Sequence, residues 1–183
     1  MLDKMQYILE QPTREKFMTW KCQIKDNDGE LLGSVTRQVP SFQYSTKTPQ
    51  VWLEDANGIR LGEMRSDKQN RLLGFAVYDQ VNQLCGIVDC PMEVRGITRS
   101  SRGSFLLLDS ARMRLAMSDA LSYPAASARF ESLKSGLSIK SPDGSLVAFL
   151  HAAKTSAGCQ IDIYPTNINQ LLILSLVASM LFL

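Results

Sequence analysis

Alternating apolar and polar residues run through most of the chain and predict β-strands. In residues 22–37 this alternation continues on both sides of a turn that runs from Asp26 to Gly29. Asn and Gly tolerate the positive φ that tight turns require, so the segment predicts a β-hairpin. The same pattern recurs in residues 51–66, 75–90, 104–119 and 137–152. A further short strand is predicted at residues 7–9, before Pro12.

Each of these five units carries a small residue seven positions after the first polar residue of its turn. The pairs are Asp26 with Gly33, Asp55 with Gly62, Asp79 with Gly86, Asp109 with Ala116, and Ser141 with Ala148. A small residue early in the returning strand indicates that another element packs closely against the sheet.

Residues 167–183 follow a different pattern, because from Leu171 onward they are apolar on every side of a helix except at Ser175 and Ser179. A helix of this kind must be buried in protein or in lipid. Its unbroken apolar part begins at Leu171 and covers about 13 residues, whereas a membrane-spanning helix needs about 20. We therefore expect a core helix, with Thr166 or Asn167 as its N-cap. A tail anchor in a membrane is the alternative.

The hairpins together supply ten or more antiparallel strands, and a sheet of that length curls, splits or closes. A helix that is apolar all round needs a wall all round, and a closed barrel provides one. The sequence thus predicts a mainly β protein. Its closed antiparallel β-barrel would enclose the C-terminal hydrophobic helix in a single domain of residues 1–183, with the helix at about 167–183.

The hairpin segments 25–33 and 54–62, followed by the apolar segment 171–183, resemble the tubby C-terminal-like superfamily, in particular its LURP-one-related and phospholipid scramblase branches. This resemblance implies a barrel of about twelve strands around the helix. It also implies a non-enzymatic module that binds phospholipid headgroups, including phosphoinositides, or a protein partner at the membrane surface. The alternative is a tail-anchored or scramblase-like membrane protein that uses the C-terminal apolar segment.

The amino-acid composition limits the functions that we expect. Hydrophobic residues make up 45% and charged residues 21% of the chain, as in ordinary globular proteins, and the net charge is only +2. The cysteines Cys22, Cys85, Cys90 and Cys159 are dispersed and His151 is the single histidine, so we expect reduced thiols and no metal site. Without a nucleophile elbow or phosphate loop, we expect no enzymatic activity and no cofactor. The absence of a signal-peptide pattern favours a cytoplasmic location, which includes peripheral attachment to membranes.

One segment has an uneven charge. Residues 95–114 contain five arginines and one acidic residue, Asp109. The arginines are Arg95, Arg99, Arg102, Arg112 and Arg114. Arg99 and Arg102 are expected on a loop, whereas Arg112 and Arg114 would share the outer face of a strand. Arginine binds phosphate in a bidentate manner, so the segment is a candidate site for anionic phospholipid headgroups or an acidic protein partner. An ordinary solvated rim is the alternative. Nucleic acid is not expected, since exposed aromatic residues are not interleaved with the arginines.

Overall fold

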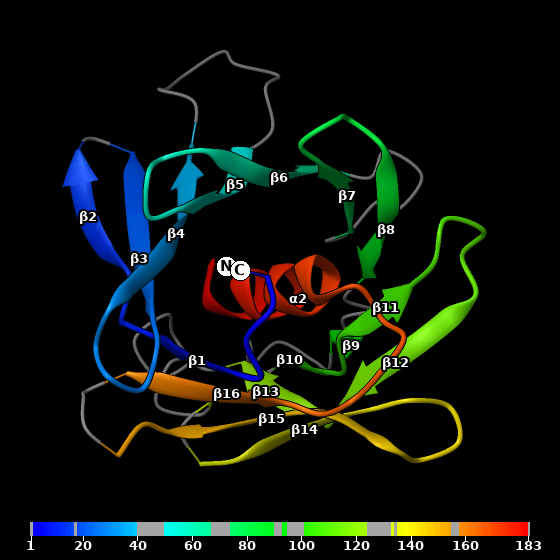
Figure 1. Cartoon of the computed structure of the whole chain (residues 1–183). Coiled ribbons are helices and arrows are strands. Elements are labelled where there is room, and N and C mark those ends of the chain that lie inside the picture. The colour runs from blue at the N-terminus through cyan, green and yellow to red at the C-terminus, as the bar shows by residue number, and fades with distance from the viewer. Residues whose placement is uncertain are drawn as a thin grey trace.

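The computed structural model describes residues 2–16, 18–39, 50–66, 74–89, 93–94, 101–123, 133, 135–154 and 158–182, with backbone alone at 93–94, 101–102, 121–123 and 182. Antiparallel strands surround helix α2 (Gln170–Phe182), which lies in the middle of the molecule (Figure 1).

The strands of the N-terminal half are β1 (Gln6–Leu9), β2 (Thr13–Lys16), β3 (Thr19–Lys25), β4 (Leu31–Gln38), β5 (Gln50–Asp55), β6 (Arg60–Ser66), β7 (Phe75–Asp79) and β8 (Leu84–Asp89). Those of the C-terminal half are β9 (Glu93–Val94), β10 (Ser101–Gly103), β11 (Leu106–Leu108), β12 (Arg114–Ser118), β13 (Leu121–Tyr123), β14 (Leu137–Lys140), β15 (Leu146–Ala152) and β16 (Cys159–Ile163).

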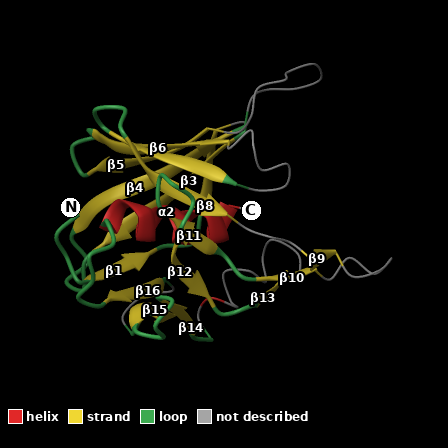
Figure 2. Ribbon diagram, turned by 90° about the vertical axis from the view of Figure 1, so that its right-hand side faces the viewer, coloured by secondary structure: helices red, strands yellow, loops and turns green. Residues whose placement is uncertain are grey.

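The main sheet closes on itself through β1. One edge of β1 pairs with β16 and the other with β3, where Leu9 lies opposite Ile24. Strand β2 takes up the remaining length of the same β3 edge, so twelve of the thirteen strands form the ring. Strands β9, β10 and β13 form a separate small sheet beside the barrel (Figure 2). The predicted closed barrel around a C-terminal helix is confirmed.

All five predicted hairpins are present, and four of them share one turn geometry. In the β3–β4 turn, the amide of Gly29 donates to the Asp26 carbonyl (3.1 Å), and Gly29 has a φ of 85°. The Asp26 carboxylate accepts the amides of Asp28 (3.1 Å) and Glu30 (3.0 Å). The β5–β6, β7–β8 and β11–β12 turns repeat this arrangement around an aspartate, whereas Ser141 starts the β14–β15 turn.

The spacing of seven residues follows from the stagger between hairpins. Asp55, the first residue of the β5–β6 turn, pairs with Gly33 of the preceding hairpin, and Asp79 pairs with Gly62 in the same way. These two turns therefore begin opposite the small residue of the hairpin before them. A constant offset between neighbours is what closure of a tilted barrel requires.

The helix packs against the small residues that the repeat places on the wall. A Cβ added at Gly62 would lie 2.7 Å from Leu171 Cδ1, and one at Gly86 would lie 3.0 Å from Leu172 Cδ1. Every residue from 171 to 180 is buried, so the helix is enclosed on all sides. The close packing predicted from the repeat is confirmed at Gly62 and Gly86.

The helix begins three residues later than predicted, and neither Thr166 nor Asn167 is its N-cap. Asn169 fills that position: its Oδ1 accepts the amide of Leu171 (2.9 Å) and its carbonyl accepts that of Leu172 (3.0 Å). The Tyr7 hydroxyl donates to Gln170 Oε1 (2.8 Å), and this bond ties the start of the helix to β1. Burial raises the pKa of Tyr7 to about 12, so the hydroxyl remains a donor at neutral pH.

The two serines of the helix differ in their hydrogen bonds. Ser179 Oγ donates to the Ser175 carbonyl (2.8 Å), whereas Ser175 Oγ is buried without a hydrogen-bond partner in the described part of the chain. We expect Ser175→Ala to raise the free energy of unfolding by about 1 kcal/mol, because it removes an unsatisfied buried hydroxyl. Ser179→Ala, the matched control, is expected to give no gain. Chemical denaturation of both variants tests this, and a loss of stability in Ser175→Ala would contradict it.

Candidate functional site

The tip of the β11–β12 hairpin carries exposed basic and apolar side chains next to each other. Met113 is 67% exposed and lies between the exposed residues Arg112 and Arg114. The Asp109 carboxylate accepts the amides of Ala111 and Met113 at 2.8 Å, so it is held behind the tip. The tip therefore places the exposed residues Arg112, Met113 and Arg114 side by side.

Arg112 has an unusual backbone conformation for its residue type. Its φ is 64°, and the equivalent positions of the other hairpins hold Gly29, Gly58, Asn82 and Gly144. A residue with a Cβ is disfavoured in this left-handed region by roughly 1 kcal/mol. Arginine at this position contributes its side chain to the surface at a cost in backbone energy.

The five arginines predicted as one site divide into parts. Arg95 and Arg99 lie outside the described residues. Arg102 belongs to strand β10 of the small sheet rather than to a loop, and its side chain is not described. Arg112 lies in the turn before β12, so it does not share a strand face with Arg114. The described part of the predicted site is thus the β11–β12 tip.

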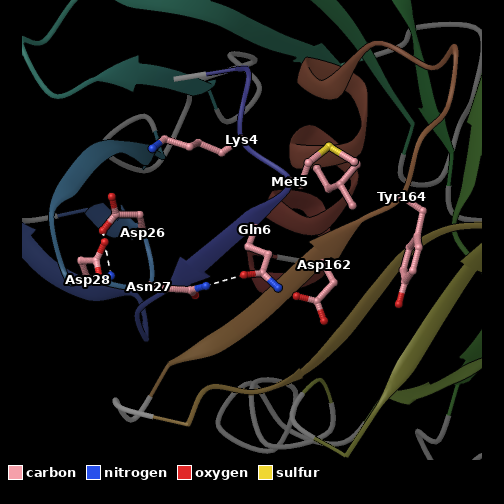
Figure 3. Close-up of a pocket in the computed structure, with 9 residues that line it drawn as sticks. Lys4, Met5, Gln6, Asp26, Asn27, Asp28, Asp162 and Tyr164 are labelled. Atoms are coloured by element: carbon pink, nitrogen blue, oxygen red, sulfur yellow. Dashed lines mark hydrogen bonds between the residues drawn. The ribbon is translucent and has the colours of Figure 1, made fainter.

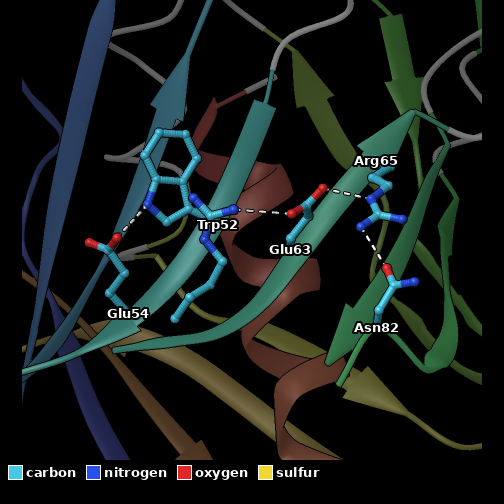
Figure 4. A network of polar contacts seen from close by, with 6 residues as sticks. Trp52, Glu54, Glu63, Arg65 and Asn82 are labelled. Carbon is cyan, nitrogen blue, oxygen red and sulfur yellow. Dashed lines mark hydrogen bonds and ion pairs between the residues drawn. The ribbon is translucent and has the colours of Figure 1, made fainter. Parts of the chain in front are cut away.

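The neighbouring hairpin, β7–β8, also ends in an exposed apolar residue. Val81 is 72% exposed, and the adjacent Asn82 accepts a hydrogen bond from Arg65 Nη2 through its Oδ1 (2.7 Å). Arg65 lies over the Tyr78 ring at 4.3 Å from its centroid. Its Nε donates to Glu63 (2.6 Å), as Figure 4 shows. These contacts hold a cation beside the Val81 tip.

The same network continues across strands β5 and β6. Glu63 Oε2 also accepts from Arg60 Nη1 (3.1 Å), and Arg60 lies over the Trp52 ring at 5.0 Å. Trp52 Nε1 donates to Glu54 (2.8 Å). No motif in the sequence indicates this network. The alternation in 51–66 places Trp52 with Glu54, and Glu63 with Arg65, on one face of their strands. Arg60 joins them through the irregularity in register next to Glu54.

An open pocket of about 460 Å³ lies elsewhere on the hairpin end of the barrel (Figure 3). Its lining comes from three distant segments, residues 4–6, 26–28 and 162–164. Three carboxylates line it, those of Asp26, Asp28 and Asp162, against the single ammonium of Lys4. An anionic headgroup is therefore disfavoured in this pocket, and the hairpin end has an acidic side and a basic side.

His151 takes part in a surface network of strands β15 and β16. Its Nε2 lies 2.8 Å from Asp162 Oδ2, and Gln160 Nε2 donates to Asp162 Oδ1 (2.7 Å). The His151 ring stacks on Phe149 with centroids 5.6 Å apart. These contacts connect β15 with β16.

The described cysteines form no disulfide. Cys22 and Cys159 are buried and Cys85 is partly buried, whereas Cys90 lies outside the described residues. Burial raises the pKa of the Cys22 thiol, which therefore stays protonated. Within the described ranges, no group of three or more His, Cys, Asp or Glu side chains could hold a metal ion.

Comparisons with known proteins bear on the fold. No family model matches the chain, and no curated protein matches it. An X-ray structure of a protein from Arabidopsis thaliana is similar, with a TM-score of 0.54 and 17% sequence identity over 97% of this chain and 90% of that chain. A likeness at this identity shows a shared fold alone. Among the described residues, no helix has the length and apolar character needed to cross a membrane.

Proposed function

We propose that this protein is a non-enzymatic binding module that attaches to the headgroups of anionic phospholipids at a cytoplasmic membrane surface. The observation that carries the proposal is the β11–β12 tip, where Arg112 and Arg114 flank the exposed Met113. Phosphate groups accept hydrogen bonds from guanidinium groups in a bidentate manner.

The arrangement of the barrel also supports an external binding surface. Helix α2 fills the interior, so a ligand must be bound on the outside of the wall or at its rim. The resemblance to tubby-like and LURP-one-related proteins, whose barrels also surround a helix, agrees with this function. On this proposal Arg95, Arg99 and Arg102 add to the same electrostatic attraction.

Replacing both tip arginines tests the proposal. Each cation close to an anionic membrane contributes about 1 kcal/mol, so Arg112→Gly with Arg114→Gln should weaken binding by roughly 30-fold. Glycine is chosen at position 112 because three other hairpins have it there, so the turn is expected to fold unchanged. The measurement is flotation with phosphatidylserine or phosphoinositide vesicles at low salt.

A matched control removes two positive charges from exposed strand positions instead, by Lys16→Gln with Lys140→Gln. This variant should float like the wild type. Binding should also fall as salt rises, since the Debye length shortens to about 8 Å at 0.15 M. Equal flotation of the arginine variant and the wild type, or no flotation of the wild type, would refute the proposal.

A further inference from the structure

Two apolar tips occur on adjacent hairpins. Strands β8 and β11 pair directly, with Leu108 opposite Ile87, so the β7–β8 and β11–β12 turns are neighbours on the rim. Val81 at the first tip and Met113 at the second are the most exposed large hydrophobic side chains in the described part of the chain, at 72% and 67%. Large apolar side chains that project singly from turns make no contribution to a protein core.

Each of these tips has a cation beside it and its carboxylate turned back. At the β11–β12 tip the cations are Arg112 and Arg114, and at the β7–β8 tip Asn82 holds Arg65. Asp79 Oδ1 accepts the amides of Val81 (3.0 Å) and Gln83 (2.8 Å), as Asp109 does in its own turn. The two turn carboxylates are therefore taken up by backbone amides, whereas Arg65 is also paired with the Glu63 carboxylate at 2.6 Å.

We infer that Val81 and Met113 insert together into the interfacial layer of a phospholipid bilayer, while the neighbouring arginines bind its phosphates. The inference rests on the proposed function and adds an apolar part to it. An amphipathic element enters the boundary between headgroups and acyl chains when apolar side chains project from a cationic surface.

A bilayer suits this surface better than a folded protein partner does. A stable protein interface buries about 800 Å² on each side over a closely packed patch. Val81 and Met113 instead project from separate turns. Because the hairpins are offset, the β11–β12 turn lies further back along the barrel axis than the β7–β8 turn. A fluid interface accommodates separate projections at unequal heights. The membrane plane is accordingly inclined to the barrel axis.

The test compares serine variants on three hairpins. Val81→Ser and Met113→Ser should each lower the partition coefficient on phosphatidylserine vesicles by about tenfold, or ~1.4 kcal/mol. The loss should persist at high salt, unlike that of the arginine variant. Leu31→Ser is the control: Leu31 is 44% exposed beside the acidic β3–β4 turn, which the β5–β6 hairpin separates from this pair. Its partition should be unchanged, and an equal loss there would overturn the assignment to two hairpins.

Insertion is measured directly with tryptophan at the same positions. Emission gained by Val81→Trp should be quenched by vesicles with brominated acyl chains, whereas that gained by Leu31→Trp should not. The native Trp20 and Trp52 contribute equally to both variants. Absence of quenching in Val81→Trp overturns the insertion.

The outcomes separate this inference from the proposed function. If the arginine variant loses binding and both serine variants keep it, the inference fails and the proposed function stands. If the serine variants lose binding to neutral vesicles that the arginine variant retains, insertion stands and recognition of anionic headgroups fails. A wild-type protein that binds no vesicles but forms dimers that Val81→Ser dissociates would overturn both.

Discussion

Removal of residues 166–183 is expected to leave an insoluble or molten chain instead of a folded barrel. Seven large apolar side chains of α2 are at most 2% exposed: Leu171, Leu172, Ile173, Leu174, Leu176, Val177 and Met180. Each contributes about 1.5–3 kcal/mol when buried, so together they contribute at most roughly 10–20 kcal/mol. The net stability of a typical domain is only about 5–15 kcal/mol. Near-ultraviolet circular dichroism and dye binding would report the loss of packing.

Truncation of one buried side chain in the same helix provides the control. Leu176→Ala should retain the fold and lose about 2–5 kcal/mol of stability, because one cavity is created and the rest of the helix remains. A truncated chain that stays soluble and unfolds cooperatively would show that the barrel does not depend on α2 for its core. That result would favour the tail anchor considered from the sequence.

Gly86→Ala is the second change expected to have a large effect. The added Cβ would lie 2.5 Å from the Leu108 carbonyl oxygen of the neighbouring strand, as well as 3.0 Å from Leu172 Cδ1. The carbonyl belongs to the backbone of the wall and cannot rotate away. Overpacking of this kind costs about 1–3 kcal/mol, and a backbone clash lies at the upper end. Thermal unfolding of the variant measures the loss.

Gly62→Ala is the matched comparison. Its nearest neighbours would be the two terminal carbons of Leu171 at 2.7 and 2.8 Å, which belong to a flexible side chain, and the Tyr78 carbonyl at 2.9 Å. Combining it with Leu171→Ala should remove part of the clash, and a double-mutant cycle measures that coupling. Combining Gly86→Ala with Leu172→Ala should relieve less. Equal relief at both positions would contradict the role of the Leu108 carbonyl.

The hairpins could be predicted because their turns are encoded locally. An aspartate that accepts two backbone amides, followed by a residue that tolerates positive φ, specifies the turn without help from the rest of the chain. The unit at 104–119 fits this rule least well, since Arg112 stands where glycine is expected, yet the Asp109 carboxylate makes the same two bonds. The buried helix could also be predicted, because a helix that is apolar on every face must be buried in protein or in lipid.

The remaining features depend on contacts between distant segments. Thr166, Asn167 and Asn169 are all suitable N-caps by residue type. The observed N-cap is Asn169, and the residue after it, Gln170, is hydrogen-bonded to Tyr7 of the distant strand β1. Strand register brings Arg65 to Asn82 across two strands, and no spacing within either segment indicates that meeting. The arginines between 95 and 114 are close together in the sequence. In the structure, strand β11 lies between strand β10, which contains Arg102, and the tip with Arg112 and Arg114.

The order of elements along the chain has a consequence for biosynthesis. All twelve wall strands precede α2, so the ribosome makes the wall before the segment that fills it. Closure also requires β1, near the N-terminus, to pair with β16, more than a hundred residues later. Such non-local pairing folds slowly and leaves apolar strand faces exposed to aggregation in the meantime. The nascent chain should therefore bind chaperones until α2 emerges, and a nonsense mutation just before α2 should lower the protein's abundance as much as one much earlier in the gene.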